Sequence, residues 1–197
     1  MAEATGAALA PVDILMVGVG GQGIILASKI LAYAAREAGY DIKVSEIHGM
    51  AQRGGSVVTQ VRLGERVYSP LVTEGEVDII LAFEQLEALR WLTYVRSGGT
   101  VIVNNQVIYP VPVLAGMARY PENIVEHLAR RARTVVVDAL ERALECGHAR
   151  AANVVLLGSL ARRMPIQLSC WLKAVEACVP ARYLEVNRAA FQRGYDL

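Results

Sequence analysis

Cysteine is scarce in this chain, and its spacing excludes the usual metal-binding patterns. The three cysteines, Cys146, Cys170 and Cys178, include no C-x-x-C pair, so we expect no zinc or iron–sulfur site within the chain. If Cys170 and Cys178 share a helix, they lie about 12 Å apart, which is too far for a disulfide. We therefore expect reduced, buried thiols and a cytoplasmic location.

Net charge and long hydrophobic runs are nearly absent as well. Lys plus Arg number 20 and Asp plus Glu number 19, so no overall field would attract nucleic acid or an anionic membrane. Residues 1–10 lack the basic start and apolar stretch of a signal peptide, and we expect a flexible tail there. The longest later apolar stretch, residues 151–161, falls well short of the roughly 20 residues of a membrane span. It predicts a core helix, and neither nucleic acid nor a membrane is expected as a partner.

Apolar runs alternate with helical patterns through the first half of the chain. Residues 12–17 run apolar up to a glycine cluster, as in a strand buried on both faces. Residues 24–38 show a helical repeat that ends at Gly39, and residues 42–47 give a second strand. This β-α-β unit indicates a parallel sheet.

The remaining segments extend this α/β pattern. Residues 56–63 alternate in polarity, and Gly64-Glu65 can turn them back into residues 66–69, which predicts a β-hairpin inserted after the second strand. We expect further strands at residues 77–83, 100–104 and 134–137, and a helix over about 85–96 that Gly98-Gly99 ends. Helices are predicted over 151–164, 168–178 and 181–194, broken at Pro165 and Pro180.

These elements predict one α/β domain spanning the 197 residues. We expect a Rossmann-like, open, mostly parallel twisted sheet with helices on both faces, and a helical C-terminal segment.

The glycine cluster Gly18-Val19-Gly20-Gly21-Gln22-Gly23 satisfies G-x-G-x-x-G between a strand and a helix. There it would let a pyrophosphate approach the backbone and the positive end of a helix. Glu46, 23 residues beyond Gly23, lies near the usual position of the acid that binds an adenosine ribose, which favours a nicotinamide cofactor. The alternative is a tight turn without a ligand, in which Gly21 and Gln22 serve a protein backbone packed against it.

A polar segment, residues 46–56, follows the second predicted strand and mixes titratable groups with glycines. Arg53 could grip a carboxylate or phosphate, and His48 could donate or accept a proton. Gly54-Gly55 would allow a close approach. The alternative is a solvated loop in which Arg53 pairs with Glu46 and His48 only packs, and the side-chain chemistry leaves the choice open.

Together, Gly18 to Gly23 and Ser45 to Val58 resemble the gamma-type domain of 2-oxoacid:ferredoxin oxidoreductases. The run from His48 to Gly55 is similar to the indolepyruvate branch and points to aryl 2-oxoacids. Further similarity covers residues 61–62, 68–70, 83–90, 153, 157–158 and 191–197, and it breaks at 1–11 and between 109 and 133.

The resemblance implies a division of labour between two polypeptides. A large partner would hold thiamine diphosphate, Mg²⁺ and iron–sulfur clusters and would pass electrons to ferredoxin, while coenzyme A takes the acyl group. This chain would bind no cofactor by itself and would be inactive alone. The resemblance suggests His48, Gln52 and Arg53 as an active-site rim. The loops expected to bind a cofactor or face the partner contain Gly18, Gly20, Gly21, Gln22, Gly23, Glu46, Gly49, Gly54, Gly55 and Ser56.

Three other hypotheses remain. The chain could be the gamma subunit of a pyruvate, 2-oxoisovalerate or 2-oxoglutarate oxidoreductase. It could instead be a free-standing NAD(P)-binding protein, or a Rossmann-like interaction module with an empty glycine turn. In isolation it could also form a homodimer through the surface meant for its partner.

Overall fold

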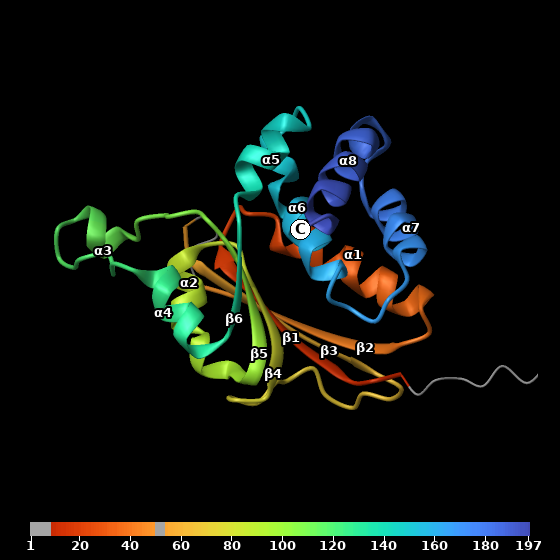
Figure 1. Ribbon diagram of the computed structural model, residues 1–197, viewed down its shortest axis with the longest axis horizontal. Helices are drawn as coiled ribbons and strands as arrows, with labels where there is room; N and C mark the ends of the chain where they lie inside the picture. The colour runs from red at the N-terminus through yellow and green to blue at the C-terminus, as the bar shows by residue number, and fades with distance from the viewer. Residues whose placement is uncertain (1–8, 50–53) are drawn as a thin grey trace, which may run out of the picture.

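The computed structural model describes residues 9–49 and 54–197 (Figure 1). Most of the predicted flexible tail, residues 1–8, lies outside the described residues. Among the described helices, none combines the length and the apolar character needed to cross a bilayer.

The described residues form a six-stranded mixed sheet. In spatial order its strands are β2 (Asp41–His48), β3 (Ser56–Gly64), β1 (Val12–Val19), β4 (Val77–Ala82), β5 (Val95–Asn104) and β6 (Arg133–Val137). β1, β4, β5 and β6 pair in parallel, whereas β3 pairs antiparallel with both β1 and β2. The predicted α/β class with a mostly parallel sheet is confirmed.

Helices cover both faces of this sheet, as predicted (Figure 1). They are α1 (Ile24–Glu37), α2 (Gln85–Arg90), α3 (Val111–Leu114), α4 (Ile124–Arg131), α5 (Ala139–Glu145), α6 (Ala152–Ala161), α7 (Leu168–Cys178) and α8 (Leu184–Tyr195). Helices α1 and α5 to α8 share one core cluster with the sheet, and α2 and α4 share the other. Successive residues of β1 enter opposite clusters, with Ile14 and Met16 in the first and Leu15 and Val17 in the second. This is why the sequence of β1 is continuously apolar.

The predicted hairpin is right in its first strand and wrong in its second. Residues 56–64 form β3, but residues 66–69 belong to no strand. The antiparallel partners of β3 are the two earlier strands β1 and β2, with Val61 opposite both Ile14 and Val44. Burial favours this position, because it places Val57, Val61 and Leu63 in the core cluster that the sheet shares with α1.

The helix predicted over residues 85–96 is too long. α2 ends at Arg90, a 3₁₀ turn covers Leu92–Tyr94, and β5 begins at Val95. Gly98-Gly99 lies inside β5 at an irregularity in its pairing with β4 and does not end a helix. A glycine at a bulge can adopt the same positive φ as a glycine at a helix cap, and Gly98 has φ 74°, so the two sequence signals are alike. The sequence does not predict the amphipathic helix α4, because Pro110, Pro112 and Pro121 precede it and interrupt the pattern.

Two of the C-terminal helices cross in backbone contact. A Cβ atom added at Gly158 of α6 would lie 2.1 Å from the carbonyl oxygen of Phe191, and one added at Gly194 of α8 would lie 1.8 Å from that of Val155. α6 is buried along its length, so the residues around the crossing cannot shift without repacking the core. The predicted apolar core helix over residues 151–161 is confirmed, with α6 beginning at Ala152.

We predict that Gly158→Ala destabilises the protein by about 3 kcal/mol, because overpacking here must separate two backbones. Elsewhere in a helix the same change stabilises by up to about 1 kcal/mol. Urea unfolding followed by circular dichroism measures the difference. Gly64→Ala is the control, since its added Cβ would make only ordinary contacts at 3.6 Å or more. Equal stability of Gly158→Ala and wild type would contradict the prediction.

Candidate functional site

The antiparallel strand β3 brings the two most distinctive segments of the sequence together. Val19, at the end of β1, lies opposite Ser56, at the start of β3. The amide nitrogen of Gly20 donates to the carbonyl oxygen of Gly55 at 2.8 Å. The glycine turn, residues 18–23, and the polar segment therefore meet at the carboxyl end of β1. In open α/β sheets, ligands bind at this edge.

The side chain of Gln22 folds back over the glycine turn. Its Oε1 accepts from the amide of Val19 at 2.7 Å, and its Nε2 donates to the carbonyl oxygen of Phe83 at 2.8 Å. A Cβ on Gly18 would lie 2.7 Å from Gln22 Oε1 and 2.8 Å from Phe83 Cβ. The first glycine of the motif is thus required by protein packing, one of the two alternatives left open by the sequence.

The amino end of helix α1 retains the chemistry of an anion site. Gly23, its N-cap, has φ 80°, and no side chain caps the helix. The first turn contains no acidic residue, so its backbone N–H groups can attract a negative group. Asn153 of α6 packs against this end, with Nδ2 donating to the carbonyl oxygen of Gly23 at 3.1 Å. A Cβ on Gly23 would lie 2.5 Å from that Nδ2 atom.

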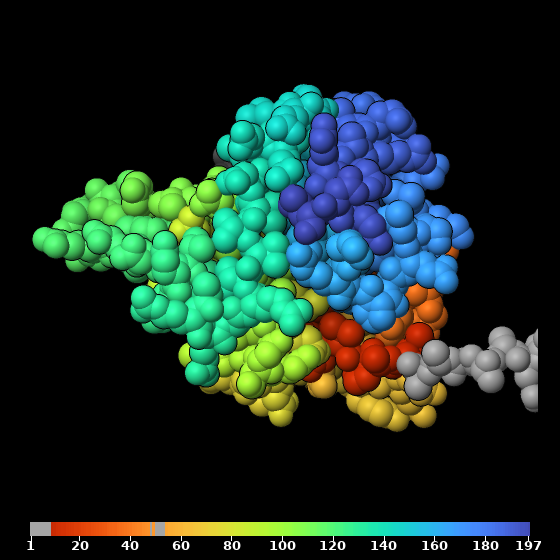
Figure 2. Space-filling view, viewed as in Figure 1, coloured from red at the N-terminus to blue at the C-terminus, as the bar shows by residue number. Residues whose placement is uncertain are grey.

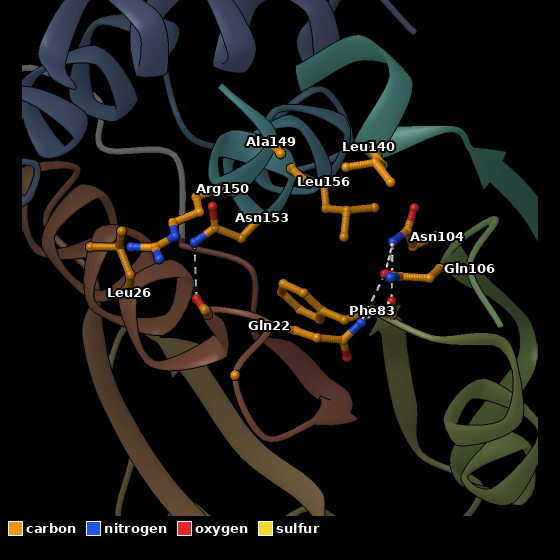
Figure 3. A pocket seen from close by; sticks show the side chains of 13 residues that line it. Gln22, Leu26, Phe83, Asn104, Gln106, Leu140, Ala149, Arg150, Asn153 and Leu156 are labelled. Carbon is orange, nitrogen blue, oxygen red and sulfur yellow. Dashed lines mark hydrogen bonds between the residues drawn. The ribbon is translucent and has the colours of Figure 1, made fainter. Parts of the chain in front are cut away.

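A cleft of about 410 Å³ opens between the carboxyl ends of the strands and the α5–α6 region (Figure 3). The cleft lies at the junction of β1 and β4. The chain leaves β1 toward one edge strand of the sheet and leaves β4 toward the other, and ligands usually bind at such a point in α/β folds. Among the described residues that line the cleft, Arg150 is the one with a charge. The full lining is Gly21, Gln22, Gly23, Leu26, Phe83, Asn104, Gln106, Leu140, Ala149, Arg150, Ala152, Asn153 and Leu156.

Side-chain amides organise the floor of this cleft. Gln22 Nε2 also donates to Gln106 Oε1 at 3.1 Å, and Asn104 Nδ2 donates to the same oxygen at 3.0 Å. Asn104 Oδ1 accepts from the amide of Ala139, which opens α5. Within the described part of the chain, the buried Oδ1 of Asn153 has no hydrogen-bond partner. The cleft therefore combines side-chain amides with one guanidinium and apolar walls, a lining suited to an anionic molecule.

Glu46 on β2 contacts helix α1. Its Oε1 accepts from the hydroxyl of Ser28 on α1 at 2.8 Å. In the Rossmann order, the strand carrying that acid lies beside the first strand. Here β3 separates β2 from β1, which places the backbone of Glu46 roughly 10 Å from β1.

The remaining predicted site residues are only partly placed. His48 ends β2 opposite Val57, and Gly49 donates to the carbonyl oxygen of Ser56 at 3.3 Å. Gln52, Arg53 and the side chain of His48 lie outside the described residues. Gly54 has φ 77° in the turn that leads into β3.

Two buried glutamates, Glu84 and Glu87, lie next to the polar segment. Ser56 Oγ donates to Glu87 Oε2 at 2.6 Å, and Arg90 Nη1 donates to the other oxygen at 2.9 Å. Glu84 is 1% exposed and accepts from the amide of Glu87 as the N-cap of α2. Burial raises the pKa of the Glu87 carboxyl above its ordinary value, and the bonds from Ser56 and Arg90 partly offset that effect.

Sequence reasoning missed the roles of Asn104, Gln106, Asn153 and the two buried glutamates. The resemblance covers Asn153 and residues 83–90 but assigns them no role. A usable signal was present in Asn104-Asn105-Gln106, where three amides follow a buried parallel strand and must therefore lie at its carboxyl edge. The cysteines are free as predicted, but they are only partly buried.

The comparisons with known proteins all indicate the same family. The family model described as pyruvate ferredoxin/flavodoxin oxidoreductase matches residues 13–197. The indolepyruvate oxidoreductase subunit IorB of Thermococcus kodakarensis is 41% identical, covering 92% of this chain and 93% of its own. The ketoisovalerate oxidoreductase subunit VorA of Methanothermobacter marburgensis is 34% identical over 75% of this chain, which is only 27% of its own length. The solved keto/oxoacid ferredoxin oxidoreductase gamma subunit of Geobacter sulfurreducens has a TM-score of 0.71 and 26% identity, covering 94% of this chain and 96% of its own.

We predict that Glu87→Gln changes how stability depends on pH. The folded protein holds the Glu87 proton to a higher pH than the unfolded chain does, because burial disfavours the charged carboxylate. That contribution to stability is complete below about 4.3 and is lost as pH rises through the raised folded pKa. Wild type should therefore lose stability relative to Glu87→Gln between pH 4 and neutrality, measured by urea unfolding at a series of pH values. Ser56→Ala, which removes a bond to the charged form, should extend the loss to higher pH. A pH-independent difference between wild type and Glu87→Gln would refute this.

Proposed function

The chain belongs to the pyruvate ferredoxin/flavodoxin oxidoreductase family, and on that premise we propose that it is the small, gamma-type subunit of an aryl-pyruvate:ferredoxin oxidoreductase, acting on indolepyruvate. The complex would convert the 2-oxoacid and coenzyme A into acyl-CoA, CO₂ and reduced ferredoxin. The single observation that supports this best is the match to an indolepyruvate oxidoreductase subunit over nearly the full length of both chains.

The redox and decarboxylation chemistry belongs, in this proposal, to a large partner chain. Among residues 9–49 and 54–197, no three His, Cys, Asp or Glu side chains are grouped so that they could hold a metal ion. Cys146 lies just after α5, and Cys170 and Cys178 both lie on α7. The described residues therefore do not fit an iron–sulfur cluster or the metal ion of thiamine diphosphate. When bound to the partner, thiamine diphosphate supplies the decarboxylation.

This chain would contribute a binding edge. The uncapped amino end of α1 offers backbone donors to an anion, and Arg53 would add a guanidinium from the polar segment. The anion could be the substrate carboxylate or a phosphate of coenzyme A. His48 and Gln52 would complete the rim that faces the partner's active site. The whole domain would work in the cytoplasm as one rigid support for this edge.

Substrate choice distinguishes our proposal from its nearest alternative, a subunit of a pyruvate, 2-oxoisovalerate or 2-oxoglutarate oxidoreductase. The assembled complex should turn over indolepyruvate with a higher kcat/KM than any of those three acids. A preference for one of the three would replace the indolepyruvate assignment and retain the gamma-type role.

A free-standing nicotinamide-dependent enzyme is the alternative from another class. The Gln22 side chain bridges the glycine turn to Phe83, and β3 displaces Glu46 by one strand. We therefore predict that NAD(P) at 1 mM leaves the thermal midpoint of the isolated chain unchanged. A ligand present at 100 times its Kd would stabilise the chain by about 2.7 kcal/mol, and a rise in melting temperature of several degrees would favour this alternative.

We predict that Arg53→Ala, co-expressed with the large subunit, lowers kcat/KM for acyl-CoA formation roughly 10- to 100-fold, the usual effect of losing a charge-assisted hydrogen bond. Arg53→Lys should recover only part of the activity, since an ammonium group cannot replace bidentate binding.

The control variant is Arg66→Ala, because Arg66 lies beyond β3 at the opposite edge of the sheet. It should retain wild-type turnover. Wild-type turnover by Arg53→Ala in an intact complex would remove Arg53 from the proposed rim.

A further inference from the structure

An arm, residues 107–120, projects from the body of the molecule between β5 and α4 (Figure 1). In the space-filling view it stands clear of the rest of the surface (Figure 2). Each residue from 107 to 120 is exposed or partly exposed. The arm therefore contributes almost nothing to the hydrophobic core, and its shape requires another explanation.

The tip of the arm is a closed knob rather than an open loop. The short helix α3 is continued by bonds from the amides of Met117 and Ala118 to the carbonyl oxygen of Pro112 at 2.8 and 3.1 Å. Pro110 and Pro112 fix φ on the side of the arm nearer β5. The segment is therefore already ordered in the isolated chain, so binding a partner costs little further conformational entropy. This is expected of a preorganised binding element.

One buried carboxylate anchors both limbs of the arm. Glu84 Oε1 accepts from the amide of Ile108 at 3.1 Å on the outgoing limb and from the hydroxyl of Tyr120 at 2.6 Å on the returning limb. Burial and the Glu84 carboxylate raise the pKa of the Tyr120 phenol, so it remains a donor. The ring of Tyr109 meets that of Tyr120 edge-on, with centroids 5.3 Å apart. The arm therefore has a defined direction relative to α2.

The exposed side chains of the arm are apolar. Val111, Leu114 and Met117 at the tip are 73, 71 and 74% exposed, and Val107 and Tyr109 on the stalk are 44 and 53% exposed. Arg119 is the one charged residue between positions 107 and 120. A cluster of this kind on an ordered projection marks a binding surface rather than a solvated loop.

The size of the arm indicates how much more surface its partner must cover. Stable interfaces use about 20 to 30 residues on each side, and the arm has 14. The surface next to its base is the carboxyl edge of the sheet, where the amide of Gln85 donates to the carbonyl oxygen of Gln106. Two hydrogen bonds connect this edge with the polar segment. Glu84 accepts from the amide of Glu87, and the Glu87 carboxyl accepts from the hydroxyl of Ser56. A partner that holds the arm and completes an interface would cover the proposed active-site rim.

A second copy of this chain fits poorly as that partner. Insertion of the knob of one copy into a hollow of another would be a head-to-tail contact, which need not close into a dimer. The cleft at the glycine turn also has a floor of amide side chains with Arg150 in its lining.

We propose that the arm is the element by which this chain docks into an apolar receptor on the large oxidoreductase chain. The inference rests on the proposed function and adds where the two polypeptides meet. In the VorA relative, the region that matches this chain is 27% of a much longer polypeptide, so there a covalent link keeps it beside the rest of that protein. A separate small chain needs a contact of high specificity in place of that link, and a rigid apolar knob supplies one.

The test uses the large subunit of the same organism's indolepyruvate oxidoreductase, tagged and co-expressed with this chain. Leu114→Asp combined with Met117→Asp should weaken the complex at least 10-fold, measured as Kd by calorimetry and as loss of co-purification. The thermal midpoint of the isolated variant should match wild type, because both side chains are exposed. Val111→Asp is a second variant with the same expectation. Leu71→Asp is the matched control, since Leu71 is 58% exposed in the connection that follows β3 at the opposite edge of the sheet, and it should bind as wild type does.

Hydrogen exchange on the wild-type complex gives an independent measurement. The amides of residues 113–118 should exchange at least 10-fold more slowly in the complex than in the isolated chain. Binding of the tip variants with wild-type Kd, or unchanged exchange in a formed complex, would overturn the docking role and leave the proposed function intact. Failure of the wild-type chain to bind the large subunit would overturn both. A dimer of the isolated chain that the tip substitutions convert to a monomer would identify a second copy as the occupant.

Discussion

The hydrogen bonds of one amide side chain hold the site together. Gln22 connects the amide of Val19 at the end of β1 with the carbonyl of Phe83 after β4 and the amide group of Gln106 after β5. Parallel strands have no hydrogen bonds to neighbours beyond their last paired residues, so side chains must satisfy the backbone there. Because Gln22 does so from within the glycine turn, the turn is fixed by the protein itself. Gly18 is needed for that packing whether or not a ligand binds.

The antiparallel strand β3 has an equally large effect on the chemistry. Had β2 paired directly with β1, as in a dinucleotide-binding fold, Glu46 would lie beside the glycine turn. Inserting β3 moves that acid away and brings Gly55 into hydrogen-bonding contact with Gly20. One change in strand order thus separates Glu46 from β1 by one strand and places Gly55 beside the turn that leads into α1.

The buried carboxylates connect this edge with the arm. Glu87 binds Ser56, Glu84 binds Tyr120 and Ile108, and the two residues are joined through the N-cap of α2. Buried carboxyl groups without hydrogen-bond partners are costly, and each of these two accepts from more than one donor. Their arrangement fixes the direction of the arm relative to the polar segment. A partner that binds the arm would therefore be oriented over the polar segment.

The amino-acid sequence by itself determined the α/β class, the continuously apolar buried strands, the C-terminal helices and the family, because periodicity and short motifs are local properties. It could not determine the strand order, the partners of β3 or the end of α2, since a glycine signal is the same for a bulge and a helix cap. Gln22 bonds to a carbonyl 61 residues away, and Asn153 to one 130 residues away. Only the tertiary structure decided such contacts, because they depend on which distant segments the burial of apolar side chains brings side by side.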